Sequence, residues 1–305
     1  MELKANAFEK VGSSLKSSQS IVRPSISFWQ DAWRRFKMNK VALVCLIYLA
    51  LIMLLCIIIP ELSHYKISDQ ELTNTNLGFF QNGHWFGTDQ LGRDLFVRVW
   101  FGVRISLFIA ITAALIDFVI GAVYGGISGY FGGKVDNVMM RTVEVINGIP
   151  YLIIVILLMV ILKPGVATII LAYVTVGWTG MARLIRGQVL QLKEQEYVLA
   201  AKVLGAGSFR IIARHLLPNV LGVIIVNMTL TVPSAIFTEA FLSYIGLGVQ
   251  IPLASLGTLA SDGVANFRTY PSQLFVPAIL ISLTMLSFNL LGDSLRDVLD
   301  PKLRK

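Results

Sequence analysis

The sequence predicts an all-α integral membrane protein with about six transmembrane helices and both termini in the cytoplasm. The mean hydropathy is +0.70, and 55% of the residues are hydrophobic. Only 14% are charged, too few to cover the surface of a soluble domain of this size. The apolar residues also form blocks long enough to cross a bilayer. We expect one transmembrane domain, residues 41–305, after a cytoplasmic N-terminal segment, residues 1–40.

Six apolar segments along the chain are the predicted spans. Pro60 is expected to end the first helix. Pro150 and Pro277 blur the edges of the third and sixth, although neighbouring helices can satisfy the backbone groups that a proline leaves unpaired. The expected spans are residues 41–59, 105–128, 149–162, 166–181, 220–241 and 274–291.

The distribution of basic residues predicts the orientation. Twenty of the 26 Lys and Arg residues fall in the N-terminal segment, the loop after the second span, the loop at residues 183–219 and the C-terminal tail. Cytoplasmic loops carry the excess of Lys and Arg, so these four segments are assigned to the cytoplasm. The net charge of +8 is then a consequence of topology. The expected surroundings are membrane lipid, and no nucleic-acid partner is expected.

The residue types needed for catalysis or metal binding do not occur in recognisable patterns. The three histidines lie in different loops, and none is paired at ligand spacing. The nearest match to a phosphate-binding loop, residues 128–135, fails the pattern at Ser128 and Val135. We therefore expect no enzyme activity, no metal and no cofactor bound by this chain. Energy for uphill transport would come from a partner subunit or an ion gradient.

The loop at residues 183–219 is long for a simple connection. Its composition predicts a helix over residues 188–204, ended by Gly205 and Gly207. Ser208 is expected to cap a second short helix, residues 209–217, which Pro218 ends. The loop is then either an amphipathic segment on the membrane surface or a helix offered to a partner's groove.

A family resemblance favours the second alternative. The loop resembles the "EAA" loop of ATP-binding-cassette importer permeases, although Leu199 stands where Glu is usual and His215 where Ile is usual. The resemblance implies a type I importer permease fold, and it implies that the loop docks on a cytoplasmic ATPase, which would bind ATP and Mg. The residues in register are Ala200, Ala201, Gly205, Leu217 and Pro218.

Three further segments, residues 84–107, 239–257 and 288–305, resemble the C-type subunit of oligopeptide and dipeptide importers. The resemblance implies import of oligopeptides by alternating access across the cytoplasmic membrane of a bacterium. It implies three kinds of partner: a second homologous permease in a heterodimer, two ATP-binding subunits and an extracytoplasmic peptide-binding protein. Dipeptides, glutathione or a metal chelate remain alternative cargoes. A weaker alternative is an ion-coupled secondary transporter, which would want paired midplane charges and internal repeats.

Several polar and small residues are candidates for specific roles. Asp117 and Glu239 are the ionisable groups nearest the bilayer core, where each either lines a translocation path or pairs helices. The spacing of Gly121, Gly125 and Gly129 permits close helix approach, within this chain or against a second permease.

A charged loop precedes the second span on the predicted outer side. It contains Asp89, Arg93 and Asp94 between turn-forming glycines. These residues either contact a substrate-delivering protein or cap the second span and fix its own loop. The sequence leaves both alternatives open.

Overall fold

The structure is a computed structural model that describes residues 28–299, so the predicted N-terminal segment lies largely outside the described residues. Regular structure in the described part is helical, as the sequence predicts. The helices are α1 (Phe28–Met38), α2 (Lys40–Leu62), α3 (Leu95–Phe131), α4 (Gly133–Asn147), α5 (Tyr151–Leu162), α6 (Val166–Val176), α7 (Trp178–Leu192), α8 (Glu196–Val203), α9 (Ser208–Ile211), α10 (Leu217–Tyr244), α11 (Leu256–Asn266) and α12 (Ser272–Leu299), with short turns η2 (Leu72–Asn74) and η3 (Ile212–Leu216).

Within the described residues, five continuous helical segments are long and apolar enough to cross a membrane, and a bent helix pair makes a sixth if it is counted as one span. All are longer than the apolar segments predicted for them, because helices continue past the hydrocarbon boundary. At 1.5 Å per residue, the 37 residues of α3 extend about 55 Å, against a core of about 30 Å. The five segments are Lys40–Leu62, Leu95–Phe131, Val166–Leu192, Ser208–Tyr244 and Ser272–Leu299.

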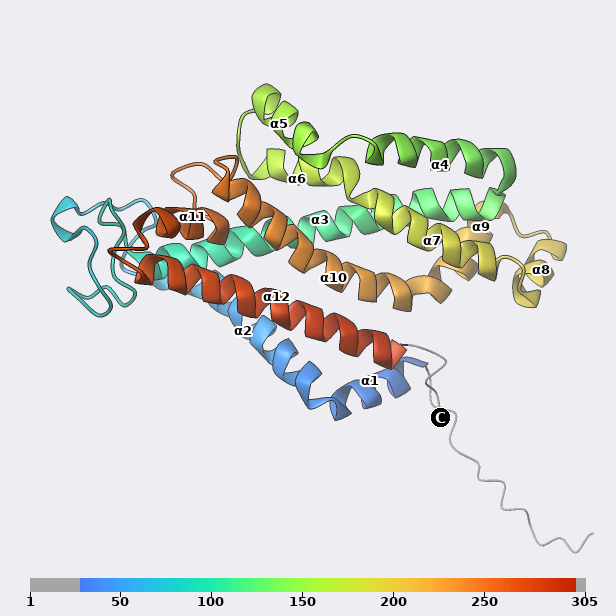
Figure 1. Cartoon of the computed structure of the whole chain (residues 1–305). Coiled ribbons are helices and arrows are strands. Elements are labelled where there is room, and N and C mark those ends of the chain that lie inside the picture. Colours follow the sequence, from blue (N-terminus) through green and yellow to red (C-terminus); the bar gives the residue numbers. More distant parts are fainter. Residues whose placement is uncertain (1–27, 300–305) are drawn as a thin grey trace, which may run out of the picture.

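The spans form an elongated bundle, shown in Figure 1. Helices α2, α3, α10 and α12 run side by side, and α6, α7 and α4 lie along the other side of α3. One end of the bundle, the α11 end, carries α11 and the long loop at residues 63–94. The opposite end, the α8 end, carries α8, α9, α1 and the C-terminal end of α12.

The first span does not end at Pro60 as predicted, because α2 continues to Leu62. Proline has no N–H, so the carbonyl of Cys56, four residues earlier, loses its helical donor. Arg104 of α3 replaces that donor, since its Nε donates to the Cys56 carbonyl at 2.9 Å. Its Nη1 also pairs with Glu61 at 3.0 Å. A side chain from a neighbouring helix thus replaces the hydrogen bond that Pro60 cannot donate, and α2 continues to Leu62.

The third span is the largest departure from prediction. Residues 149–162 were expected to cross alone, but α5 has only 12 residues and is too short. The segment before it forms α4, which was expected to be a loop, and the α4–α5 pair is bent by 75°. Gly148, Ile149 and Pro150 separate the two helices, and the residue before a proline disfavours helical backbone. Counted as one span, the pair combines a mixed-polarity half with an apolar half.

Helix α11 was not predicted, because its 11 residues are too few and too mixed to resemble a span. Ser255 caps its N-terminus in a capping box with Thr258. Gly257 and Gly263 let α11 approach its neighbours closely. A Cβ at Gly257 would come within 2.6 Å of the Ala240 backbone on α10, and one at Gly263 within 2.6 Å of the Leu274 backbone on α12.

Candidate functional site

The predicted loop at residues 183–219 is largely continuous with the helices on either side. Helix α7 runs to Leu192 and a new helical segment begins at Ser208, so α8 and two short breaks are all that separate them. The single helix expected over residues 188–204 is broken at residues 193–195. In an unbroken helix Val189 and Val198, nine residues apart, would face in opposite directions, about 180° apart. The break lets both valines be buried in one cluster at the α8 end.

Helix α8 ends as predicted, at Gly205. The glycine has φ +81°, its N–H donates to the Lys202 carbonyl, and the N–H of Ala206 donates to the Ala201 carbonyl at 3.0 Å. These two bonds are a Schellman motif, in which glycine is preferred because φ is positive. Gly207, with φ −68°, precedes the next helix, so Ser208 is its first residue and not its cap.

Pro218 does not end a helix, contrary to prediction. It occupies the first turn of α10, within the continuous segment Ser208–Tyr244. The preceding turn, Ile212–Leu216, is π-helical, and the N–H of Leu217 reaches the Ile212 carbonyl five residues back. A wider turn is one way in which a helix accommodates a residue without an N–H. His215 and Leu217 are half-buried here, and Pro218 is exposed.

The outer face of α8 presents apolar side chains at the tip of the bundle. Leu199 is 49% exposed, Val203 87% and Leu204 86%, and Phe209 of α9 is 83% exposed. On the same helix Ala200 is exposed and Ala201 is half-buried. Charged side chains on a solvated helix would be the ordinary outcome at such positions, so the apolar surface indicates a partner. We call Leu199, Val203, Leu204 and Phe209 the α8 surface.

Polar contacts connect the α8 end to the helices behind it. Asp136 at the start of α4 accepts two hydrogen bonds from Arg186 of α7, each 2.5 Å long. Asp136 also accepts one from Ser128 of α3. Lys193, where α7 ends, donates to the Gly129 carbonyl at 3.0 Å. A bidentate pair of this kind holds helices in a defined register, so α3, α4 and α7 are fixed together just behind α8.

The three glycines singled out by their spacing all face α7 within this chain. A Cβ at Gly121 would come within 2.6 Å of the Met181 Cβ, and one at Gly129 within 2.9 Å of the Val189 Cβ. A Cβ at Gly125 would meet the Ala182 carbonyl. Small residues along α3 therefore allow close packing of α3 on α7.

Asp117 lies near the middle of α3 and is 3% exposed. Its carboxylate lies against Gly177, where a Cβ would come within 2.5 Å of Oδ2. Within the described residues its buried Oδ1 has no hydrogen-bond partner. It lines a cavity of about 650 Å³ together with Tyr173, Arg183, Asn227 and Thr231.

Glu239, the other candidate in the core, has a full set of partners. Ser106 of α3 donates to Oε2 at 2.9 Å, and Ser243 and Ser255 donate to Oε1 at 2.8 and 2.6 Å. The side chain is 1% exposed. Hydrogen bonds from three hydroxyl groups satisfy a buried carboxylate, so Glu239 ties α3, α10 and the start of α11 together.

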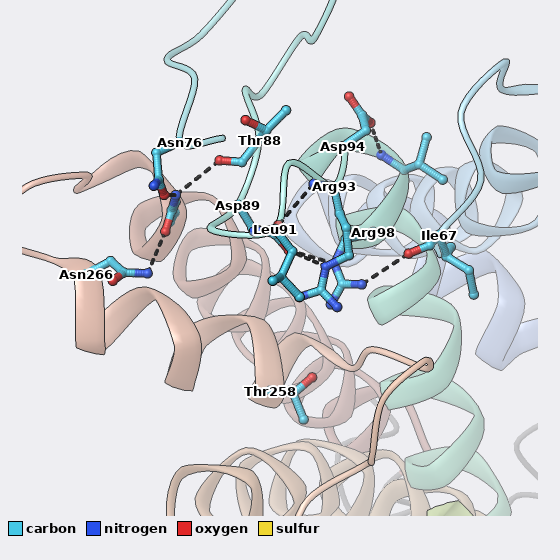
Figure 2. Close-up of polar contacts among 12 residues, drawn as sticks. Ile67, Asn76, Thr88, Asp89, Leu91, Arg93, Asp94, Arg98, Thr258 and Asn266 are labelled. Atoms are coloured by element: carbon cyan, nitrogen blue, oxygen red, sulfur yellow. Dashed lines mark hydrogen bonds and ion pairs between the residues drawn. The ribbon is translucent and has the colours of Figure 1, made fainter. Parts of the chain in front are cut away.

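The charged loop before α3 folds inward, as Figure 2 shows. Asp89 lies between Arg93, at 2.6 Å, and Arg98 of α3, at 3.5 Å. Arg98 also donates to the Ile67 carbonyl at 3.2 Å. Asp89 is 9% exposed, and both arginines are less exposed. These side chains fix the loop onto α3 and leave little charged surface for a partner.

Asp94 also attaches the loop to α3. Its Oδ1 accepts from the Val97 N–H at 2.8 Å, which makes Asp94 the N-cap of α3, and its Oδ2 contacts His84 Nδ1 at 2.8 Å. Gln273 of α12 donates to Asn76 at 3.0 Å and to the Thr88 carbonyl at 3.1 Å, so the loop is also attached to α12. The loop's exposed side chains include polar and charged groups such as Asp69 and Glu71, and also two aromatic rings, Phe80 at 79% and Trp85 at 60% exposed.

Three residues outside the predicted set emerge from the geometry. Gly177 makes room for the Asp117 carboxylate, Arg104 supports α2, and Arg186 binds Asp136. Each acts on a residue about 50 or more positions away in sequence, so no local pattern signals it. One signal was present in the sequence. Pro60 has no N–H, so the carbonyl of Cys56 needs another donor, and Arg104 is such a donor.

The helical bundle has five or six membrane crossings, and an apolar helix is exposed between two of them. These features define a polytopic membrane component with a surface for a partner. Comparison with known families agrees. The model for "Binding-protein-dependent transport system inner membrane component" matches residues 118–305, and that for "N-terminal TM domain of oligopeptide transport permease C" matches residues 27–78. The chain belongs to the family of binding-protein-dependent transport system inner membrane components.

Two curated relatives come from Bacillus subtilis (strain 168). The dipeptide transport system permease protein DppC is 55% identical over 95% of this chain and 91% of its own length. The oligopeptide transport system permease protein OppC is 53% identical over 98% of both chains. Among solved structures, an inward facing conformation of the MetNI methionine ABC transporter has a TM-score of 0.54 at 20% identity, over 67% of this chain and 97% of that one. That likeness shows a shared fold.

Proposed function

We propose that this chain is the C-type permease subunit of an ATP-driven importer that carries oligopeptides across the cytoplasmic membrane of a bacterium. The observation that carries the proposal is the α8 surface, an apolar surface at one end of a membrane bundle, on a helix anchored by the buried Val198. Its position in the chain coincides with the segment that resembles the ATPase-docking loop of importer permeases. The high identity to two peptide permeases supports the cargo class.

The α8 end is the cytoplasmic end in this proposal, and both termini lie in the cytoplasm. The concentration of Lys and Arg in segments near this end supports that orientation. Helix α1, the end of α12 and α8 share one end of the bundle, as six crossings would require (Figure 1). The loop at residues 63–94 then faces outward, where the exposed Phe80 and Trp85 offer a surface to a peptide-binding protein.

The proposed mechanism is alternating access with α8 as the lever. Two ATPase subunits bind ATP and Mg, and one of them holds the α8 surface. When the ATPases close, the force on α8 passes through buried Val198 to the cluster shared by α7, α9 and α10. It continues to α3 through the close packing at Gly121, Gly125 and Gly129. A second homologous permease forms the other half of the path.

The cargo is a peptide, and the two Bacillus relatives divide between dipeptides and oligopeptides in their names. Residues 27–78 match a model named for an oligopeptide permease, which favours the longer cargo. Dipeptide import is the second candidate, favoured by the slightly higher identity to DppC. Uptake of di-, tri- and pentapeptides of one composition would distinguish the two.

Affinity purification of the tagged chain from its native membrane tests the proposal. The expected result is a complex with one second permease and two ATP-binding subunits. The variant Val203→Glu, which puts a charge on the α8 surface, should lose the ATPases and keep the second permease. Purification without any ATPase from wild-type membranes would contradict the proposal.

A further inference from the structure

The cavity beside Asp117 combines a buried carboxylate with neutral hydrogen-bonding groups. Helix α10 contributes Asn227, Thr231 and Ser234, and α7 contributes Gly180 and Arg183. The cavity holds about 650 Å³, a size suited to a segment of peptide. Its position at the middle of α3 and at the α6–α7 junction places it deep in the membrane part of the bundle.

Asp117 is the buried carboxylate of this cavity, and no described residue compensates its charge. Of the other two buried acids within the described helices, Glu239 accepts hydrogen bonds from three serine hydroxyls and Asp136 pairs with Arg186. No described side chain forms an ion pair with Asp117, and its Oδ1 is unbonded. An isolated carboxylate at this depth costs several kcal/mol unless a cation or a donor reaches it.

The backbone is arranged to keep the carboxylate where it is. Any side chain at position 177 would displace it, because a Cβ there would come within 2.5 Å of Oδ2 and 2.7 Å of Oδ1. The glycine therefore gives the carboxylate a fixed place at the cavity wall. Arg183 lines the same cavity and is the one cation among its described lining residues. A ligand with a positive group at one end and amides or a carboxylate beyond it matches this set.

We propose that Asp117 is an anionic subsite that binds the primary ammonium group of a peptide while the peptide occupies this cavity. The inference rests on the proposed function and adds a specificity-determining residue to it. The ammonium group is common to all unmodified peptides, and the amide and hydroxyls of α10 match a peptide backbone. Recognition by these groups leaves the cargo's side chains free, so one site serves many sequences.

The test is ATP-driven uptake into proteoliposomes that hold the complete transporter with saturating peptide-binding protein. The lipids are phosphatidylcholine and phosphatidylglycerol, so the peptide is the source of primary ammonium groups. Uptake of a tripeptide is compared with uptake of its N-acetylated form. For Asp117→Asn we expect the free tripeptide to lose about ten- to hundredfold in uptake per ATP, the worth of one charged hydrogen bond, and the acetylated form to be unchanged.

Two further variants separate recognition from structure. Gly177→Ala keeps the charge and displaces the carboxylate, so it should also lose uptake of the free tripeptide selectively. Glu239→Gln, the matched control, removes a partnered carboxylate and should change both peptides by the same factor. Equal losses of both peptides in Asp117→Asn, or no loss of either, would overturn the subsite. Absence of ATP-driven uptake by the wild type would instead overturn the proposed function, and the subsite with it.

Discussion

The loop before α3 contains charged side chains that are buried. Asp89 contacts Arg93 and Arg98, all three are nearly inaccessible, and the cluster joins the loop at residues 63–94 to α3. A charge buried with its partners is stable only while every partner remains, because removal of one leaves the others desolvated and unpaired. Of the two roles that the sequence left open for these residues, the contacts fit the second, attachment of the loop at residues 63–94 to α3.

Replacement of Asp89 by Asn should destabilise the protein strongly, by about 3 kcal/mol, because two buried arginines lose their counter-ion. Thermal unfolding of the purified complex, followed by intrinsic fluorescence, measures the change. The matched control is Glu144→Gln, which removes an exposed ion pair with Arg141 and should have little effect. A melting temperature for Asp89→Asn equal to that of the control would show that the buried cluster contributes nothing.

A second test concerns the glycines of α3. Gly125→Ala should destabilise the α3–α7 contact by about 1–3 kcal/mol, because the new methyl group meets the Ala182 carbonyl. Gly187→Ala on α7 makes the same chemical change where nothing lies within 4 Å, and should leave stability unchanged or raise it slightly. Melting temperatures of the two variants in one detergent give the comparison. Equal values would contradict close packing at Gly125.

Contacts with neighbouring parts of the fold determine where helices in this protein continue and where they break. Helix α2 continues beyond Pro60 because Arg104 donates a hydrogen bond to the Cys56 carbonyl, which has no backbone donor. The helix before α10 widens into a π-helical turn ahead of Pro218. Conversely, the chain between α7 and α8 is interrupted without any proline or glycine, because Val189 and Val198 must share one buried cluster. Helix boundaries here follow packing as much as local propensity.

Removal of Arg104 should cost about 1–3 kcal/mol, since the Cys56 carbonyl is left without a donor. The cost should be smaller in a Pro60→Ala background, where the new N–H of residue 60 can bond to that carbonyl. Thermal unfolding of Arg104→Met, Pro60→Ala and the double variant completes the cycle. Strict additivity of the two single effects would contradict the assigned role of Arg104.

Helix α8 provides a matched pair of glycines. Gly205 has φ +81° and Gly207 has φ −68°, and both have open space where a Cβ would lie. Gly205→Ala should strain the turn after α8 by about 1–2 kcal/mol and weaken ATPase association. Gly207→Ala should leave association unchanged. Quantified co-purification of the ATPase subunits measures both, and an equal effect of the two substitutions would argue against a role for the turn.

At the scale of the whole molecule, the sequence predicted the features that depend on local chemistry. Long apolar runs predicted the membrane crossings, and Gly205 predicted the end of α8. Helix α4 escaped prediction because its polar residues resemble a loop, although they pair with α7 through Asp136 and Arg186. The contact of Asp117 with Gly177 escaped for another reason, since it joins residues 60 positions apart and only the packed bundle brings them together.

Peptide uptake by proteoliposomes assembled with and without each partner is the decisive test of the proposed function. We expect uptake only when this chain, the second permease, both ATPase subunits, the peptide-binding protein and ATP are all present, because in the proposed function this chain supplies a path and a lever while the ATPases supply the energy. Uptake driven by this chain alone, or by an ion gradient in the absence of ATP, would contradict it.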